Sequence, residues 1–144
     1  RKKPPAVSTE VGTREGKNIV VIGDRAGDEQ HEMKMPPEGY VSRVESVLLP
    51  QLLIMKKLET DFGFYNYQSD SKLIRLRRDR VERVKDSDVL WRVKTTLNDE
   101  AEESVATYRD GEMTSVVLAT GVRMEPTDLQ GLLKLWKSKG LPLD

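Results

Sequence analysis

The chain has 144 residues, with 24 basic and 24 acidic side chains, so its formal net charge is zero. Hydrophobic residues make up 37% of it and charged residues 33%, which predicts a modest core beneath a heavily charged surface. The absence of cysteine excludes disulfides, thiolate metal sites and cysteine nucleophiles, and the neutral balance excludes a global field that would drive binding to polyanions.

The length favours a single domain. No apolar run approaches the roughly 18 residues of a membrane span, so we predict no membrane-spanning segment and a soluble intracellular protein. The chain starts at Arg1 rather than Met. We therefore keep open a processed organellar form, mitochondrial or plastid.

Residues 1–16 predict a flexible basic arm, because they contain two prolines, four basic side chains and almost nothing to bury. Residues 17–144 then form one α+β domain. It opens with a short buried strand, Ile19–Ile22, which Gly23 ends. Residues 23–39 are polar and rich in Gly and Pro, which predicts a long loop that either has a function or is held by another part of the molecule.

From Tyr40 onward the apolar residues recur every three or four positions, which predicts an amphipathic helix of about five turns. Pro50 falls inside it and predicts a kink or two abutting helices, because proline removes a backbone donor and clashes one turn back. The apolar positions are Val41, Val44, Leu48, Leu52, Met55, Leu58 and Phe62.

An antiparallel meander is expected next. The aromatic stretch 62–68 and the alternating stretch 89–97 both predict strands, and Trp91 and Val93 share one face of the second. Asp110-Gly111 between two β-rich runs predicts a type I′ hairpin. The expected pairs are Arg109 with Glu112, Tyr108 with Met113, and Val105 with Val116.

The C-terminal segment predicts a second amphipathic helix, with Leu129, Leu132, Leu133 and Trp136 on one face. Thr127 or Asp128 caps it, and Gly140 ends it. This helix either docks on the sheet of its own chain or lies partly on a partner. The resulting fold class is α+β: an antiparallel β-meander packed with a kinked helix in the N-terminal half and a C-terminal amphipathic helix.

Residues 72–85 are strongly basic, whereas acidic side chains predominate from Asp86 to Glu112. Their alternation favours two strands or one bent strand over a helix. This basic strip is our candidate partner-binding site, together with Trp136 on the last helix. Its members are Lys72, Arg75, Arg77, Arg78, Arg80, Arg83 and Lys85.

Catalytic and metal chemistry find little support. His31 is the only histidine, and it lies with four acidic residues, Asp24, Asp28, Glu29 and Glu32, in the polar segment. Phosphate-loop, EF-hand and nucleophile-elbow patterns are absent. We therefore interpret the segment as a solvated acidic loop and predict no metal, no cofactor, no catalytic residue and no enzyme activity.

The leading hypothesis is a non-catalytic protein-interaction module, such as an assembly factor or a small subunit of a larger complex. It would bind a protein partner through the basic strip and the adjacent acidic segment. The alternative is an RNA-binding or single-stranded nucleic-acid-binding protein that uses the same strip against phosphates. The sequence leaves the oligomeric state open.

Overall fold

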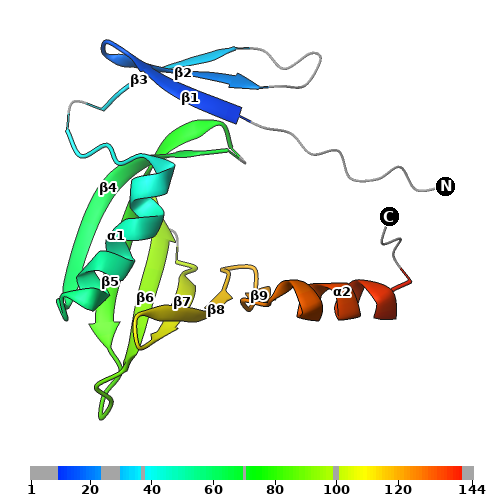
Figure 1. Cartoon of the computed structure of the whole chain (residues 1–144). Helices are drawn as coiled ribbons and strands as arrows, with labels where there is room; N and C mark the ends of the chain where they lie inside the picture. The colour runs from blue at the N-terminus through cyan, green and yellow to red at the C-terminus, as the bar shows by residue number, and fades with distance from the viewer. Residues whose placement is uncertain (1–9, 24–29, 37, 70, 99–100, 141–144) are drawn as a thin grey trace.

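The computed structural model describes residues 10–23, 30–36, 38–69, 71–98 and 101–140. They form two antiparallel sheets and two helices, which confirms the α+β class (Figure 1). Among these residues, neither helix has the length and apolar character needed to cross a membrane.

The smaller sheet has three strands in the order β1-β2-β3. They are β1 (Glu10–Glu15), β2 (Asn18–Gly23) and β3 (His31–Lys34). The predicted buried strand is confirmed, since Ile19, Val20 and Val21 are at most 4% exposed in β2. Residues 10–15 were expected in an unstructured arm, but they pair with β2 along their whole length. The other part of that arm, residues 1–9, lies outside the described residues.

The predicted polar loop 23–39 is only partly described. Its residues 31–34 form β3, which pairs with β2, so this part of the segment is held by the small sheet. Residues 24–29 lie outside the described range.

The larger sheet is a meander in which every strand pairs with its neighbours in the sequence, in the order β4-β5-β6-β7-β8-β9. The strands predicted at 62–68 and 89–97 are confirmed, and the basic stretch forms one long strand, β5. The bounds are β4 (Thr60–Gln68), β5 (Leu73–Arg83), β6 (Leu90–Leu97), β7 (Ser104–Arg109), β8 (Glu112–Val117) and β9 (Arg123–Met124).

The predicted hairpin joins β7 and β8. Asp110 and Gly111 both have positive φ angles, 52° and 84°, as a type I′ turn requires. The pairs of Arg109 with Glu112 and of Tyr108 with Met113 are confirmed. Beyond them the prediction was wrong by one residue: a register shift between Thr107 and Tyr108 places Val105 opposite Val117 rather than Val116.

Helix α1 (Arg43–Met55) begins at a capping box, in which Ser42 and Glu45 each accept a hydrogen bond from the other's backbone N–H. It is shorter than the predicted five turns, since Phe62 belongs to β4. Pro50 lies inside the helix, and the kink at this position stays a prediction. Upstream, Val41 N–H donates to the Tyr65 carbonyl, which ties the chain before α1 to the edge of β4.

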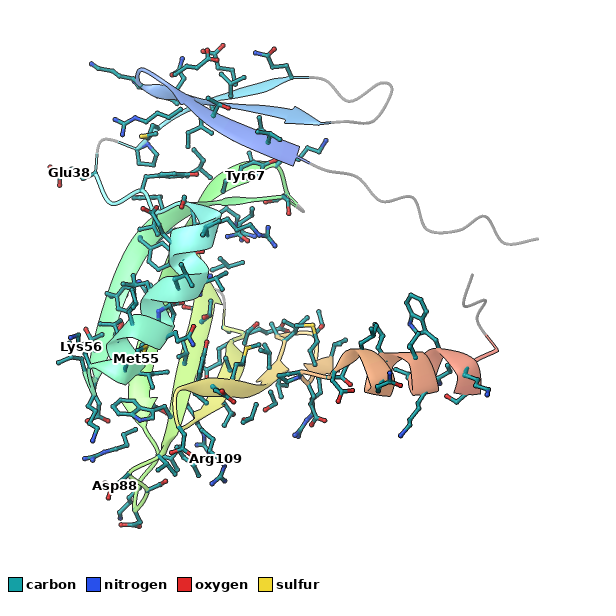
Figure 2. The ribbon with its side chains drawn as sticks, in the orientation of Figure 1. Glu38, Met55, Lys56, Tyr67, Asp88 and Arg109 are labelled. Atoms are coloured by element: carbon teal, nitrogen blue, oxygen red, sulfur yellow. The ribbon has the colours of Figure 1, made fainter. Side chains whose placement is uncertain are left out.

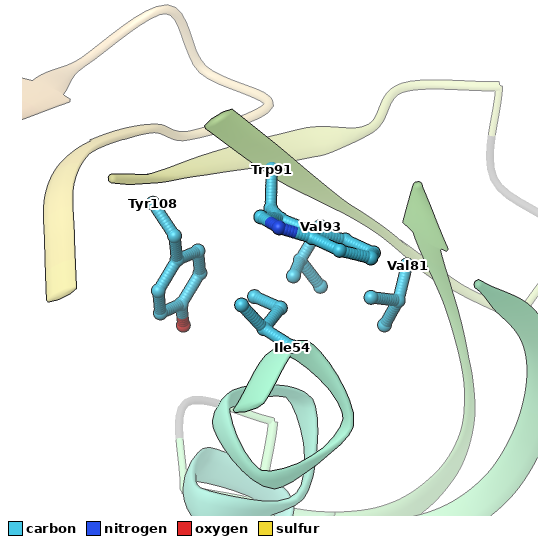
Figure 3. Close-up of a cluster of buried hydrophobic side chains, with 5 residues drawn as sticks. All are labelled: Ile54, Val81, Trp91, Val93 and Tyr108. Atoms are coloured by element: carbon cyan, nitrogen blue, oxygen red, sulfur yellow. The ribbon is translucent and has the colours of Figure 1, made fainter. Parts of the chain in front are cut away.

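The core lies between α1 and the larger sheet. Ile54 of α1 packs on residues from β5, β6 and β7, all of them at most 8% exposed (Figure 3). These partners are Val81, Trp91, Val93 and Tyr108. Burial of each such side chain contributes about 1.5–3 kcal/mol, so this cluster is a substantial source of stability for the larger sheet.

Helix α2 (Leu129–Ser138) has Asp128 as its N-cap, and Asp128 accepts a hydrogen bond from the Gly131 N–H. The expectation that α2 packs on the sheet of its own chain was wrong. None of its residues is buried, and the helix projects away from both sheets (Figure 1). Gly140, with φ of 65°, follows the end of the helix as expected.

Candidate functional site

The predicted basic strip is divided by the geometry of β5. Successive side chains of a strand point to opposite faces, so a single strand cannot place all of its arginines together. The face that α1 covers carries Arg75, Arg77 and Arg83, and the buried Val81 lies on this face too. On the open face lie Arg78 and Arg80, while Lys72 and Lys85 lie beyond the two ends of the strand. The role of these seven residues in partner binding stays a prediction.

Arg77 is largely committed to the interior. Its Nε and Nη2 atoms donate to the two carboxylate oxygens of Asp79, each at 2.8 Å, and Asp79 is fully buried. Thr95 Oγ1 donates a third hydrogen bond to Asp79, also at 2.8 Å. The guanidinium lies 5.3 Å from the ring centroid of Phe64. This group stabilises the fold, so Arg77 offers little charge to a partner.

Two further arginines of the strip form exposed ion pairs. Arg80 binds Asp61 at 3.0 Å, and Arg83 binds Asp88 at 3.4 Å, with every one of these side chains more than half exposed. Such pairs exchange readily with solvent, so both arginines stay accessible to a charged partner. Lys72, Arg75 and Arg78 also interact with other groups of the chain.

The open face of the larger sheet nevertheless collects basic side chains from three strands. The register places Arg80 opposite Lys94, and residues directly opposite in an antiparallel pair project to the same face. Lys94 also binds Glu82 at 2.8 Å. We call this set the open basic face; its members are Arg78, Arg80, Arg92, Lys94 and Arg109. In the sequence, Arg92, Lys94 and Arg109 fall within the acidic segment. The alternation in 89–97 nevertheless already placed Arg92 and Lys94 on the same face of a strand.

The largest departure from the sequence prediction concerns α1. Ser46, Pro50 and Ile54 are the buried positions of the helix. The side chains expected in the core instead point away from the sheet. We call them the outer stripe: Val44, Leu48, Leu52 and Met55, which are 69%, 48%, 56% and 67% exposed. Contiguous exposed apolar side chains are uncommon on a surface that contacts only water, so the outer stripe is a candidate interaction surface.

A cleft of about 1290 Å³ lies between the small sheet and the start of α1. Ile19 and Val21 of β2 line it on one side, and Gly12 lies opposite Val21 in β1. Tyr67 lies close to the small sheet (Figure 2) and completes the wall from β4. Further apolar lining comes from Val11, Met35, Tyr40, Val44, Val47 and Leu48. The cleft thus has apolar walls and joins the N-terminal end of the outer stripe.

Three charged residues, Arg14, Arg43 and Glu45, line the cleft beside these apolar walls. Hydrogen bonds from the side chain and the backbone N–H of Ser42 lower the pKa of Glu45, so its carboxylate stays charged at neutral pH. Burial, and secondarily the charge of Glu45, raises the pKa of Tyr40, so its phenol stays neutral. Apolar walls with two guanidinium groups suit an apolar segment that carries acidic residues.

Among the described residues, the other candidates from the sequence are not arranged as a ligand-binding site. Trp136 is 42% exposed and lies on α2, and this helix projects away from both sheets and therefore from the basic strip on β5 (Figure 1). In the described ranges, no three His, Asp or Glu residues come close enough together to hold a metal ion. Most of the acidic segment that follows β2 is not described, so its interpretation as a solvated loop stays a prediction.

Comparison with known proteins gives no assignment: neither a protein-family model, nor a curated protein, nor a solved structure matches this chain. The features that bear on its function are therefore the cleft, the outer stripe and the open basic face.

Proposed function

We propose that the chain is a non-catalytic protein-interaction module that holds an apolar, acid-flanked segment of a partner protein in the cleft. The observation that carries the proposal is the cleft itself, which joins apolar residues of both sheets and of α1 beside three charged side chains. Val44 and Val47 line it and are 69% and 62% exposed. Each valine would contribute about 1 kcal/mol when a partner covers it.

The charges give the partner its expected character. Arg14 and Arg43 would each bind a carboxylate on the partner segment, whereas Glu45 would repel one placed near the start of α1. The exposed arginines of the strip add a longer-range attraction, which raises the rate of association more than the affinity. An assembly factor or a small subunit of a larger complex would have this combination.

Filling the cleft tests the proposal. Gly12→Ile adds a side chain whose Cβ would lie 3.8 Å from Val21 Cγ2, an ordinary contact, so the fold should tolerate it. The matched control is Gly63→Ile on the open face of β4, where the added Cβ also meets its neighbours at ordinary distances. A photo-crosslinking side chain at position 47 should capture an apolar, acid-flanked peptide in a cell extract, and Gly12→Ile should abolish that capture.

The control should leave the capture intact. If Gly12→Ile and wild type capture the same peptides with equal yield, the cleft is not the binding site. If the captured peptides are predominantly basic, the role given to Arg14 and Arg43 is wrong.

The open basic face favours RNA binding as a second candidate function. Five basic side chains on three neighbouring strands could follow a phosphate backbone, and Tyr65 of β4 is 39% exposed. Titration with a single-stranded RNA should then show affinity that falls steeply with salt and is lost in Arg78→Glu/Arg92→Glu. Arg83→Glu/Lys85→Glu is the matched control away from this face. Absence of binding at low salt would eliminate this candidate.

A further inference from the structure

Helix α2 has an apolar face that nothing in the described structure covers. On this face Leu129 and Trp136 are 67% and 42% exposed, Leu132 and Leu133 between them are half-buried, and no α2 residue is buried. A helix of ten residues is marginal in water on its own, because isolated helices shorter than ~12–15 residues rarely persist. Its apolar face therefore requires a partner surface.

We propose that α2 of one copy of the chain docks on the outer stripe of α1 in a second copy, and that the exchange is reciprocal. The two-fold relation gives two identical α1–α2 contacts in one dimer. The inference goes beyond the proposed function: α2 would occupy Leu48, Leu52 and Met55. Of these three, only Leu48 also lines the cleft, so the walls formed by Val44, Val47 and the small sheet stay open to another protein.

The lengths of the two apolar surfaces match. Leu48 to Met55 on α1 and Leu129 to Trp136 on α2 each cover seven helical steps. At 1.5 Å per residue, each surface is about 10.5 Å long. Side by side, the two helices would cover each other's apolar residues from end to end.

The charges select an antiparallel arrangement. When the helices run in opposite directions, Asp128 at the start of α2 lies near Lys56 and Lys57, which follow α1. At the other end, Lys137 approaches Glu45 in the first turn of α1. The parallel arrangement would bring Lys137 to the lysines instead. Opposed helix dipoles favour the antiparallel arrangement as well.

A second copy supplies α2 more readily than the same chain does. The backbone of α1 lies nearest to β4 and β5, whereas β9, which precedes α2, is at the opposite edge of the sheet. The linker 125–128 spans at most about 14 Å, and α2 projects away from α1 (Figure 1). A reciprocal dimer also buries enough surface. Each contact would bury roughly 100 Å² of accessible surface on each of about six apolar side chains. Two such contacts together reach the ~1,200 Å² that a specific interface buries.

The absence of cysteine makes disulfide trapping in the full chain a clean test. Single-cysteine variants are mixed in pairs and oxidised, and the disulfide-linked dimer is measured on a non-reducing gel. The antiparallel contact should link Met55→Cys to Leu129→Cys, and Leu48→Cys to Trp136→Cys, at least several-fold faster than Leu48→Cys to Leu129→Cys. Because each chain carries one cysteine, only contacts between copies produce these bonds.

Sedimentation equilibrium supplies the second readout. Wild type should dimerise, whereas Leu52→Glu and Trp136→Glu should be monomeric. Val122→Glu, at a position 54% exposed outside both surfaces, should remain dimeric. Lys137→Glu should weaken the dimer several-fold at low salt, and Lys134→Glu, on the opposite side of α2, should not.

These substitutions are at exposed positions, and circular dichroism would verify that each variant folds. A wild type that is monomeric up to about 100 µM, or crosslinks with no preference among the cysteine pairs, would overturn the proposal. A dimer that survives both Leu52→Glu and Trp136→Glu would overturn it too, since another surface would then be responsible. Gly12→Ile should dimerise normally, so failure of the cleft and failure of the dimer are separate results.

Discussion

Arg77 binds the fully buried carboxylate of Asp79 through two hydrogen bonds of 2.8 Å, two positions along the same strand. Residues at this spacing point to the same face of β5, which allows the two side chains to meet beneath α1. The pair converts a residue of the basic strip, which the sequence offered as a surface charge, into part of the interior.

Asp79→Ala should destabilise the fold by about 3–5 kcal/mol, because Arg77 would keep its charge in a site where its side chain is only 19% exposed. Urea unfolding measures the change. Asp61→Ala, which removes the partner of Arg80 in an exposed pair, should cost less than about 1 kcal/mol. If the two substitutions lowered the free energy of unfolding by similar amounts, Asp79 would be solvated rather than buried.

Ile54→Ala should cost about 2–5 kcal/mol, because Ile54 fills the space above Val81 and Trp91. Leu52→Ala removes the same kind of side chain from the outer stripe of α1 and should change stability by less than about 0.5 kcal/mol in dilute, monomeric protein. Thermal unfolding of both variants decides which face of α1 is buried. A larger loss for Leu52→Ala would reverse the orientation of the helix.

Stability should fall in alkaline solution through Tyr108. Burial raises its pKa above the ordinary value of 10.0; Arg77 acts against this shift, and Asp79 adds to it. The folded state therefore holds the phenol proton more tightly than the unfolded state does. The associated stabilisation is fully present below pH 10 and is lost as the pH rises through the folded pKa.

Lysines also titrate in alkaline solution, so the effect of Tyr108 is isolated by comparing the unfolding of wild type with that of Tyr108→Phe. The difference in free energy of unfolding between wild type and Tyr108→Phe should be constant below pH 10 and should decline above it. A difference that does not vary with pH would mean that the phenol titrates alike in both states.

Gly111→Ala should destabilise the β7–β8 hairpin by about 1 kcal/mol or more, because Gly111 has a φ of 84°. No atom lies within 4 Å of the position of an added Cβ, so the cost is purely conformational. Gly63→Ala in β4 is the matched control, with ordinary contacts and no positive φ, and should be neutral or slightly stabilising. Hydrogen exchange of β7 and β8 amides would report the local loss.

Several elements were predictable from residues a few positions apart. The alternation in 89–97 identified β6, the Asp-Gly pair identified the hairpin, and the spacing of leucines identified α2. Its cap was predicted at Thr127 or Asp128, and the structure has Asp128. The register beyond the hairpin was not predictable, because the shift between Thr107 and Tyr108 depends on how β7 and β8 pack with the other strands.

The candidate site was less predictable than the fold. The cleft joins β1, β2, β4 and α1, and its lining residues Val11 and Tyr67 are 56 positions apart in the chain, so no local pattern encodes that meeting. The open basic face combines Arg78 with Arg92 and Arg109, whose proximity follows only from strand pairing. The basic strip, taken as one block in the sequence, is split between two faces of a sheet.

The sequence by itself determined the periodicities, turns and caps, since each depends on backbone preferences and on neighbours within one or two turns. Only the tertiary structure decided which side of α1 is buried, because apolar residues lie on more than one side of this helix. Leu48, Leu52 and Met55 are exposed, whereas Leu53 and Ile54 face the core, and the spacing of apolar residues alone did not distinguish the two sets. It also decided which charges are available: Asp79 is neutralised by Arg77 and bound by Thr95, which lies sixteen positions away on the neighbouring strand. Contacts of that range arise from packing, which no local pattern records.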